Sequence, residues 1–435
     1  MKSVFAFAFL CALAACGASS SQESGARPDY GAQPTIGAPN AGPLPTLNQA
    51  HAVGWPAGGK PVAPSGFVVT RFADHLNHPR WLYVLPNGDV LVAQATTEEE
   101  TGGGVVGWVR NSIQRDAGAF GAGANSIVLL RDANADGVVD GDALYAQNLH
   151  QPFGMALLGD WLYVGDTDAV LRYRYATGDM RATAPPETVV ALPHRDGDNG
   201  HWTRNIVVRP DGRKLYVGVG SSSNIADNGI EAERNRAAIW EINPDGSGMR
   251  IYASGLRNPN GMDFEPATGA LWVAVNERDM LGDTVPPDYM TSVRDGGFYG
   301  WPYSYWGQHV DDRVQPPRPD LVARAIAPDY ALGAHTASLG LTFYRANVFP
   351  AHYRGGVFIG QHGSWNRSHR SGYKVVFVPF ANGRPSGDVE DFLTGFLNAR
   401  GEAQGRPVGV AVDRTGALLV ADDVGNVVWR VAPTR

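Results

Sequence analysis

The chain has 435 residues, of which 43% are hydrophobic and 18% are charged, and its formal net charge is −7. This is the composition of a globular protein with ample apolar material for a large core. The mild acidity and the absence of a basic cluster in the sequence give no reason to expect nucleic acid as a partner. The 54 glycines and 30 prolines indicate many turns.

The N-terminus has the pattern of a secretory signal. Lys2 precedes the apolar run Val4 to Ala15, which is too short to span a membrane. The run ends in Leu-Ala-Ala before Cys16, which resembles a bacterial lipobox. We therefore predict that residues 1–16 are a lipoprotein signal peptide and that lipidated Cys16 anchors a periplasmic protein, at the outer membrane. An ordinary signal peptide with a nearby cysteine is the alternative.

Residues 17–64 are rich in Gly, Ala, Ser and Pro and show no apolar period, so they are predicted to form a flexible tether. From residue 65 onward one pattern repeats. A polar loop precedes an apolar strand, a turn with Gly follows, and a second strand ends in small residues. The six second strands are 89–93, 161–165, 214–218, 270–274, 356–360 and 417–421.

Repeated sheets of short strands, without a convincing long amphipathic helix, predict an all-β fold, a six-bladed β-propeller over residues 65–435. A sandwich or two separate β-domains is the alternative. Two long loops, 96–125 and 279–337, interrupt the pattern and are expected to carry function.

In a propeller, the polar loops ahead of the six first strands should meet at one end of the central channel. Arginine forks pair with carboxylates through two parallel hydrogen bonds, so this end suits a planar anion with several carboxylates. The alternative is that each polar side chain forms hydrogen bonds only with the backbone of its own loop. This alternative fits two converging arginines poorly, because their positive charges repel each other unless an anion lies between them. The side chains concerned are His78, Gln151, His201, Arg257, Asn258, His335 and Arg406.

Two oxygen-rich stretches are candidates for calcium. The first follows the D-x-N-x-D-G-x-x-D start of a calcium loop, although Ala143 occupies the twelfth position, where a Glu is usual. An Asp-rich turn without metal is the alternative. The second stretch is weaker. The candidate ligands are Asp132, Asn134, Asp136 and Asp140 in the first stretch, and Asn276, Glu277 and Arg278 in the second.

Four segments resemble the sugar dehydrogenases that depend on pyrroloquinoline quinone (PQQ), a six-bladed propeller family of soluble aldose and sorbosone dehydrogenases. The R-N-P-x-G and G-G-x-Y-G-W-P motifs, in this order, are specific together, and the resemblance runs from about Gly66 to the C-terminus. The segments are 255–262, 296–302, 363–367 with 372–376, and 405–410.

The resemblance implies PQQ and Ca²⁺ as cofactors, a small-molecule sugar as substrate and an electron acceptor that the sequence does not name. It implies that His201 is the general base, that Arg257 and Asn258 contact the quinone oxygens and that Arg406 contacts the PQQ carboxylates. Backbone carbonyls of 276–278 are the implied calcium ligands. Gln151, His335 and Arg367 complete the expected cofactor contacts.

Two departures from the family stand out. The glucose-oxidising relatives have an Asp after the return strand that orients the base, and here that place reads Val219-Gly220-Ser221-Ser222. Asp196 and Asp198 are the alternatives. Relatives also use a Lys near the fifth repeat, for which this chain offers His362, Arg367 and Lys374.

The sequence thus predicts a PQQ-dependent oxidoreductase that oxidises an aldose or sorbosone-like sugar, with the proton passing to His201 and the hydride to PQQ. One alternative is a propeller that binds a ligand without catalysis. Another is a calcium-dependent propeller hydrolase such as a lactonase. A lactonase needs a ring of carboxylates and Asn around a channel metal, whereas these loops supply more His and Arg.

Overall fold

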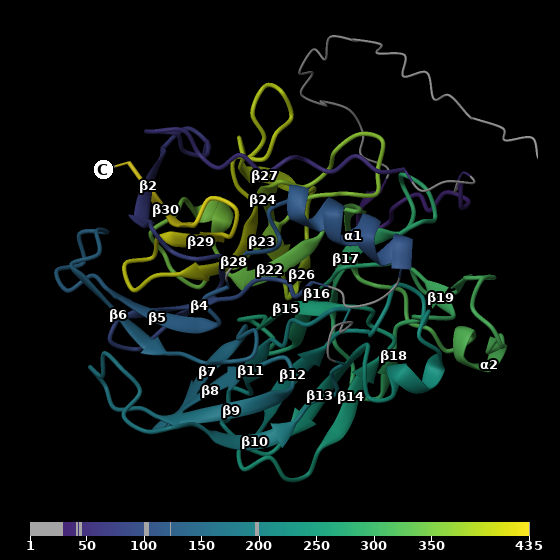
Figure 1. Cartoon of the computed structure of the whole chain (residues 1–435), viewed down its shortest axis with the longest axis horizontal. Helices are drawn as coiled ribbons and strands as arrows, with labels where there is room; N and C mark the ends of the chain where they lie inside the picture. Colours follow the sequence, from purple (N-terminus) through teal and green to yellow (C-terminus); the bar gives the residue numbers. More distant parts are fainter. Residues whose placement is uncertain are drawn as a thin grey trace, which may run out of the picture.

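The computed structural model describes residues 29–40, 42, 46–99, 104–121, 123–195 and 200–434. Six sheets, antiparallel except for one short edge strand, surround a central axis, which confirms the six-bladed β-propeller (Figure 1). The blades are numbered in chain order. Blade 1 contains β3 (Pro79–Val84), β4 (Val90–Gln94), β5 (Ser126–Arg131) and β6 (Gly141–Ala146). Blade 2 contains β7 (Met155–Leu158), β8 (Trp161–Gly165), β9 (Ala169–Arg174) and β10 (Glu187–Ala191). Blade 3 contains β11 (Ile206–Val208), β12 (Leu215–Val219), β13 (Ala238–Ile242) and β14 (Arg250–Ser254), with β18 (Gly297–Phe298) parallel at its edge.

The other three blades hold the second half of the chain. Blade 4 contains β15 (Pro259–Phe264), β16 (Leu271–Val275), β17 (Pro287–Ser292) and β21 (Tyr330–Ala334), with β1 (Tyr30–Gly31) at its edge. Blade 5 contains β22 (Ser338–Phe343), β23 (Val357–Gln361), β24 (Lys374–Val378) and β27 (Glu390–Leu393). Blade 6 contains β28 (Pro407–Val412), β29 (Leu418–Asp422), β30 (Val427–Pro433) and β2 (Phe67–Ala73). Two small hairpins lie outside the blades, β19 (Ser304–Tyr305) with β20 (His309–Val310) and β25 (Phe380–Ala381) with β26 (Arg384–Pro385).

The first strand of each blade lines the axis, and these strands contact one another in the closed order β3, β7, β11, β15, β22, β28 and back to β3. Glycine permits this close approach. A Cβ at Gly154 would lie 2.4 Å from the nitrogen of Ile206, and one at Gly261 would lie 2.3 Å from the nitrogen of Leu341. Gly154, directly before β7, and Gly261, within β15, are therefore required by the packing of neighbouring blades.

The last blade is completed by the N-terminal strand of the ring. β2 pairs antiparallel with β30, with Val69 opposite Val431. Pairing between strands from opposite ends of the chain closes the ring and leaves no gap between the first and last blades.

The described part of residues 17–64 differs from the predicted tether. β1 pairs with β21, and Ala50 is fully buried. The indole nitrogen of Trp55 donates to a carboxylate oxygen of Asp422 at 2.7 Å. The folded body therefore begins before residue 65. We call residues 46–55 the N-terminal strap.

The sequence shows no convincing long amphipathic helix, and within the loop 96–125 the structure has α1 (Gly104–Asp116), a helix of 13 residues. Figure 1 shows α1 beside the purple N-terminal segment, and the nitrogen of Ala52 donates to the carbonyl of Asp116 at 3.0 Å. The other helices are short: η1 (Ile230–Glu233), α2 (Pro319–Val322) and η2 (Ala351–Tyr353). Within the described ranges, no helix combines the length and apolarity needed to cross a membrane.

Candidate active site

The proposed base, His201, lies in the loop directly ahead of blade 3. Its partner Ser221 lies just after the end of β12. Nδ1 of His201 lies 2.9 Å from Oγ of Ser221 and 3.2 Å from its carbonyl oxygen. Burial lowers the pKa of His201 well below its usual value, and the nearby positive charge of Arg257 lowers it further. The imidazole is therefore neutral at neutral pH and can accept a proton.

Arg257 lies beside His201 and is almost completely buried. Its Nη2 donates to the side-chain oxygen of Asn224 at 2.9 Å and lies 3.3 Å from a carboxylate oxygen of Asp279. Its Nη1 donates to the carbonyl of Glu277 at 2.6 Å. The guanidinium is thereby fixed in one orientation next to the imidazole.

Asp279 also binds His335. Nδ1 of His335 lies 3.2 Å from a carboxylate oxygen of Asp279, and Nε2 lies 2.8 Å from the carbonyl of Gly282. Both partners are acceptors, so this arrangement favours a ring of His335 that donates from both nitrogens. Burial alone would lower the pKa of His335, but its hydrogen bond to Asp279 raises it. We call Ser221, His201, Arg257, Asp279 and His335 the base cluster.

Asn258 adds an unpaired acceptor to this cluster. Its side-chain oxygen is buried, and no donor among the described residues reaches it. A Cβ at Gly220 would lie 2.7 Å from this oxygen and 2.5 Å from Cβ of His201. A glycine at position 220 is therefore needed for Asn258 and His201 to approach each other.

A second polar cluster lies around blade 6. Arg406 is buried, its guanidinium stacks 5.1 Å above the ring of Tyr373, and Nη2 lies 3.3 Å from the hydroxyl of Tyr373. Nη2 also lies 3.4 Å from the carbonyl of Ala50 in the strap. Nε of Arg406 is buried, and no acceptor in the described parts of the chain reaches it. A buried guanidinium with a spare donor is suited to an anionic ligand.

Arg80, Asp423 and His362 adjoin Arg406 in this second cluster. Nη1 of Arg80 pairs with a carboxylate oxygen of Asp423, which also lies 2.9 Å from Nε2 of His362. Burial lowers the pKa of His362 to about 4, despite the raising effect of Asp423. Nε of Arg80 is a further buried donor without an acceptor in the described ranges. We call Arg80, His362, Tyr373, Arg406 and Asp423 the arginine cluster.

Trp202 connects the two clusters. It follows His201 directly, and the guanidinium of Arg80 lies 5.2 Å from its ring centroid. The base cluster and the arginine cluster are thus brought to one end of the propeller, as the loop pattern predicted for His201, Arg257, Asn258, His335 and Arg406.

Other predicted site residues have local partners. The side-chain amide of Gln151 donates to the carbonyl of Thr96 at 2.9 Å. Nη1 of Arg367 donates to the carbonyl of Ala334 at 3.0 Å and lies 3.4 Å from Asp29. Lys374 pairs with Asp391 at 2.7 Å. Their contacts with a cofactor stay predictions, and Asp196 and Asp198 lie outside the described residues.

Sequence reasoning did not single out Asp423 or Tyr373. Asp423 belongs to the Asp-Asp pair at the end of β29, and two acidic residues directly after a strand would have been a usable signal. Tyr373 lies in one of the segments that resemble the sugar dehydrogenases, but that pattern gave it no role. Its hydroxyl reaches the strap, 323 positions away in the sequence.

The second calcium stretch forms a tightly bonded loop. The carbonyls of Asn276 and Glu277 accept hydrogen bonds from Nη1 of Arg257 at 3.3 and 2.6 Å. Burial raises the pKa of Glu277 to about 8. Arg278 forms a buried ion pair with Asp311. A cation at these carbonyls would therefore compete with the guanidinium of Arg257.

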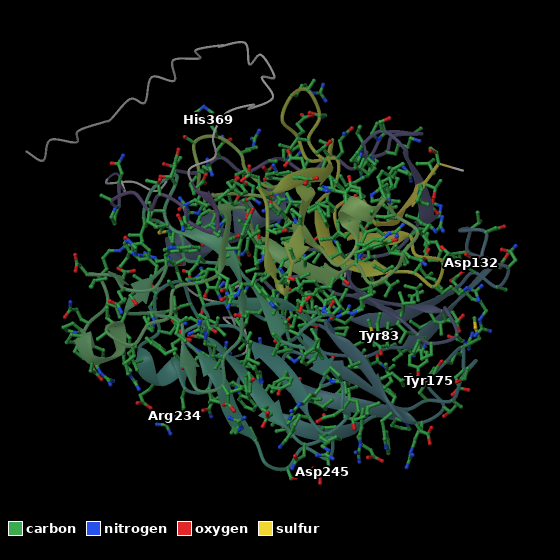
Figure 2. The ribbon with its side chains drawn as sticks, turned by 180° about the vertical axis from the view of Figure 1, so that it is seen from behind. Tyr83, Asp132, Tyr175, Arg234, Asp245 and His369 are labelled. Atoms are coloured by element: carbon green, nitrogen blue, oxygen red, sulfur yellow. The ribbon has the colours of Figure 1, made fainter. Side chains whose placement is uncertain are left out.

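The first calcium stretch turns back on itself. The carboxylate of Asp132 accepts backbone N–H groups of Asp136 and Gly137 at 3.2 and 2.9 Å, and Asp140 accepts that of Ala133 at 2.7 Å. Figure 2 shows Asp132 near the outer edge of the molecule, away from the axis. Across the described ranges, no group of three or more His, Cys, Asp or Glu side chains is arranged to hold a metal ion. Calcium in either stretch stays a prediction.

Comparison with known proteins finds two matching family models and related sequences. A family model for glucose/sorbosone dehydrogenases matches residues 163–364, and a TrAA12-like model matches residues 321–434. An uncharacterised protein of Borreliella burgdorferi is 30% identical over 295 residues, which cover 66% of this chain and 76% of that protein. The chain belongs to the glucose/sorbosone dehydrogenase family. The aldose sugar dehydrogenase YliI of Escherichia coli is 30% identical over 120 residues, which are 27% of this chain and 30% of that enzyme.

Solved structures share the propeller fold with this member of the family. The PQQ domain of pyranose dehydrogenase from Coprinopsis cinerea superposes with a TM-score of 0.68 at 21% identity, covering 86% of this chain and 97% of that domain. The PQQ-bound aldose sugar dehydrogenase of Streptomyces coelicolor has a TM-score of 0.55 at 16% identity, covering 85% of this chain and 99% of that one. At these identities the likeness establishes the fold.

Proposed function

We propose that this protein is a PQQ-dependent dehydrogenase that oxidises an aldose or a sorbosone-like sugar. The observation that carries the proposal is the neutral imidazole of His201 next to Trp202, whose ring lies against Arg80 of the arginine cluster. In that cluster Arg80 and Arg406 each keep a buried Nε–H without an acceptor in the described ranges. The family membership, and the PQQ named for the Coprinopsis and Streptomyces structures, support the choice of cofactor.

The arginine cluster fits an acidic planar cofactor. Arg406 and Arg80 each present a buried Nε–H without an acceptor in the described ranges, and Asp423 is the carboxylate in the cluster. Charge-assisted hydrogen bonds to the carboxylates of PQQ would satisfy these donors. The ring of Trp202 forms a flat apolar wall beside Arg80. When bound, PQQ supplies an acceptor for two electrons in the form of hydride.

The base cluster fits the proton transfer that must accompany sugar oxidation. The substrate C–H bond breaks and its electron pair leaves with the hydrogen as hydride. The hydroxyl proton passes to His201, and the C–O bond becomes a double bond. The proposal assigns to Arg257, whose positive charge acts on His201, and to the amide N–H group of the adjacent Asn258 the stabilisation of negative charge that develops on an oxygen.

Calcium is a further part of the proposal, with the carbonyls of Asn276 and Glu277 as ligands. Among the described residues, no three His, Cys, Asp or Glu side chains are arranged to hold a metal ion. Binding would require Arg257 to release these carbonyls. Catalysis by His201 and the arginines is therefore assigned without a step through the metal.

Reconstitution of the purified protein tests the proposed function. PQQ titration followed by reduction of an artificial dye with a panel of sugars should reveal oxidation of at least one aldose or sorbosone-like sugar. His201→Ala should bind PQQ with unchanged affinity but turn over about a hundredfold more slowly, the usual size of a general-base contribution. His352→Ala, which changes an exposed histidine, is the matched control. PQQ binding without turnover on any sugar would favour the non-catalytic alternative.

We propose in addition that the protein is periplasmic and anchored through lipid on Cys16, which lies outside the described residues. The proposal is supported by the Leu-Ala-Ala-Cys end of the apolar N-terminal run. Cys16→Ser should move the protein from the membrane fraction into the soluble fraction. Retention in the membrane fraction with the same detergent requirement would contradict the anchor.

A further inference from the structure

Nδ1 of His201 has no carboxylate partner among the described residues. The structure instead brings a serine to the ring. Ser221 is fully buried, and both its hydroxyl and its carbonyl oxygen face Nδ1 of His201, at 2.9 and 3.2 Å. The same carbonyl also accepts the backbone N–H of His201 at 3.2 Å. Ser221 is therefore the closest polar neighbour that the described residues give this side of the ring.

The hydrogen-bond pattern determines the tautomer. The hydroxyl of Ser221 donates its single proton to the carbonyl of Ser223 at 2.7 Å. Toward His201 the hydroxyl oxygen can then only accept, and the Ser221 carbonyl can only accept in any case. Nδ1 must carry the ring proton, so the lone pair of the neutral imidazole is on Nε2.

We propose that Ser221 is the positioning residue of His201, holding Nδ1–H through its hydroxyl and carbonyl oxygens so that Nε2 is the proton acceptor. The inference rests on the proposed role of His201 as the base. It assigns the orienting role to a neutral serine, where the resemblance to the sugar dehydrogenases implied a carboxylate.

The backbone of Ser221 connects the two halves of the base cluster. Its N–H donates to the carbonyl of Arg257 at 2.8 Å, while its carbonyl holds His201. The residue before it, Gly220, allows His201 and Asn258 to approach. A displacement of Ser221 would thus move the imidazole and the Arg257 loop together. The Gly-Ser pair after β12 is part of the active site.

Replacing a carboxylate with a serine changes the electrostatics of the base. The charged groups that act on the ring are Arg257, Asp279 and Arg236, of which the two arginines disfavour the imidazolium and Asp279 favours it. Ser221 orients the ring without adding negative charge. An ionised carboxylate in its place would stabilise the imidazolium and make the base stronger.

Nitrogen NMR of the resting protein, with ¹⁵N-labelled histidine at pH 8, tests the tautomer directly. The His201 resonances, assigned by their loss in His201→Ala, should show a protonated Nδ1 and an unprotonated Nε2. The opposite tautomer would overturn the inference. This measurement needs neither cofactor nor substrate, so it stands even if the protein oxidises no sugar.

Kinetics of two Ser221 variants provide the second test. Ser221→Ala should lower kcat about tenfold, the effect of one hydrogen bond, with unchanged PQQ affinity. Ser221→Asp should shift the acid limb of the pH profile of kcat/KM upward by about one unit or more. Ser222→Ala is the matched control. The buried hydroxyl of Ser222 donates to Glu233 at 2.6 Å, whereas the ring of His201 bonds to Ser221. Equal kcat and pH profiles in wild type, Ser221→Ala and Ser221→Asp would overturn the inference.

Discussion

The carbonyl oxygen of Ala50 lies 3.4 Å from Nη2 of Arg406, so the N-terminal strap contacts a side chain that is proposed to hold the cofactor. The hydroxyl of Tyr373 lies 3.3 Å from the same nitrogen and accepts the backbone N–H of Ala50 at 3.4 Å. Trp55 and Arg406 are joined through Asp422, which accepts the indole N–H of one and the backbone N–H of the other. The strap is therefore part of the wall of the candidate active site.

Tyr373→Phe should weaken PQQ binding about fivefold to tenfold, because it removes the hydroxyl that Arg406 and Ala50 share, and a net hydrogen bond contributes about 1 kcal/mol. The dissociation constant can be measured by titration of the apo-protein. Tyr344→Phe is the control, since its buried hydroxyl donates to the carbonyl of Gly416 at 2.7 Å, away from the arginine cluster. Equal PQQ affinity in Tyr373→Phe and Tyr344→Phe would contradict a contribution of the strap to PQQ binding.

Arg406→Ala should raise the PQQ dissociation constant ten- to a hundredfold. Losing a charge-assisted contact costs about 1.5–3 kcal/mol. The same titration measures the effect, with Arg400→Ala as the control because that arginine is 79% exposed. An unchanged constant in Arg406→Ala would place the cofactor carboxylates elsewhere.

The propeller could be predicted from the sequence because each blade is built from local contacts. Strand, turn and return strand follow one another within a few tens of residues, so periodicity and glycine positions reveal them. The strap could not be predicted. Asn48 donates to the carbonyl of Ser368, 320 positions away, and a Gly- and Pro-rich composition does not reveal such a partner. The segment of α1 contains two glycines and three valines, which have low helix propensity, so its composition does not reveal the helix.

The site was predictable in its residue types and less so in its contacts. The repeat placed His201, Arg257 and Arg406 at equivalent points of their blades, and the structure brings their loops to one end. Which acceptor orients His201 depends on a hydroxyl that also bonds Ser223. Such a choice is made by side-chain geometry and leaves no pattern in the sequence.

Asp311→Ala should destabilise the protein by about 3–5 kcal/mol, because it leaves the buried guanidinium of Arg278 without its partner. Both side chains are only 2% exposed. Urea unfolding followed by tryptophan fluorescence measures the difference. Asp312→Ala, at the exposed neighbouring position, should have little effect. Equal free energies of unfolding for Asp311→Ala and Asp312→Ala would show that the ion pair between Arg278 and Asp311 is exposed to solvent.

The last prediction concerns the pH dependence of turnover. The neutral imidazole of His201 is the active form, and its folded-state pKa lies well below the usual 6.5 because of burial and the charge of Arg257. Lowering the pH from 8 through 6.5 therefore leaves the base unprotonated, and kcat/KM should stay flat over that range. It should fall only at more acidic pH, once protons begin to bind Nε2.

The measurement is kcat/KM for one sugar across this pH range, at constant ionic strength and with saturating PQQ. His352→Ala should reproduce the wild-type profile, because that exposed histidine pairs with Glu390 far from the base cluster in the sequence and contacts none of its members. Arg257→Gln should move the acid limb to higher pH, since removing the neighbouring positive charge makes protonation of His201 easier. A wild-type limb centred at 6.5 or above would mean that His201 is solvated like an ordinary surface histidine, or that another group accepts the proton.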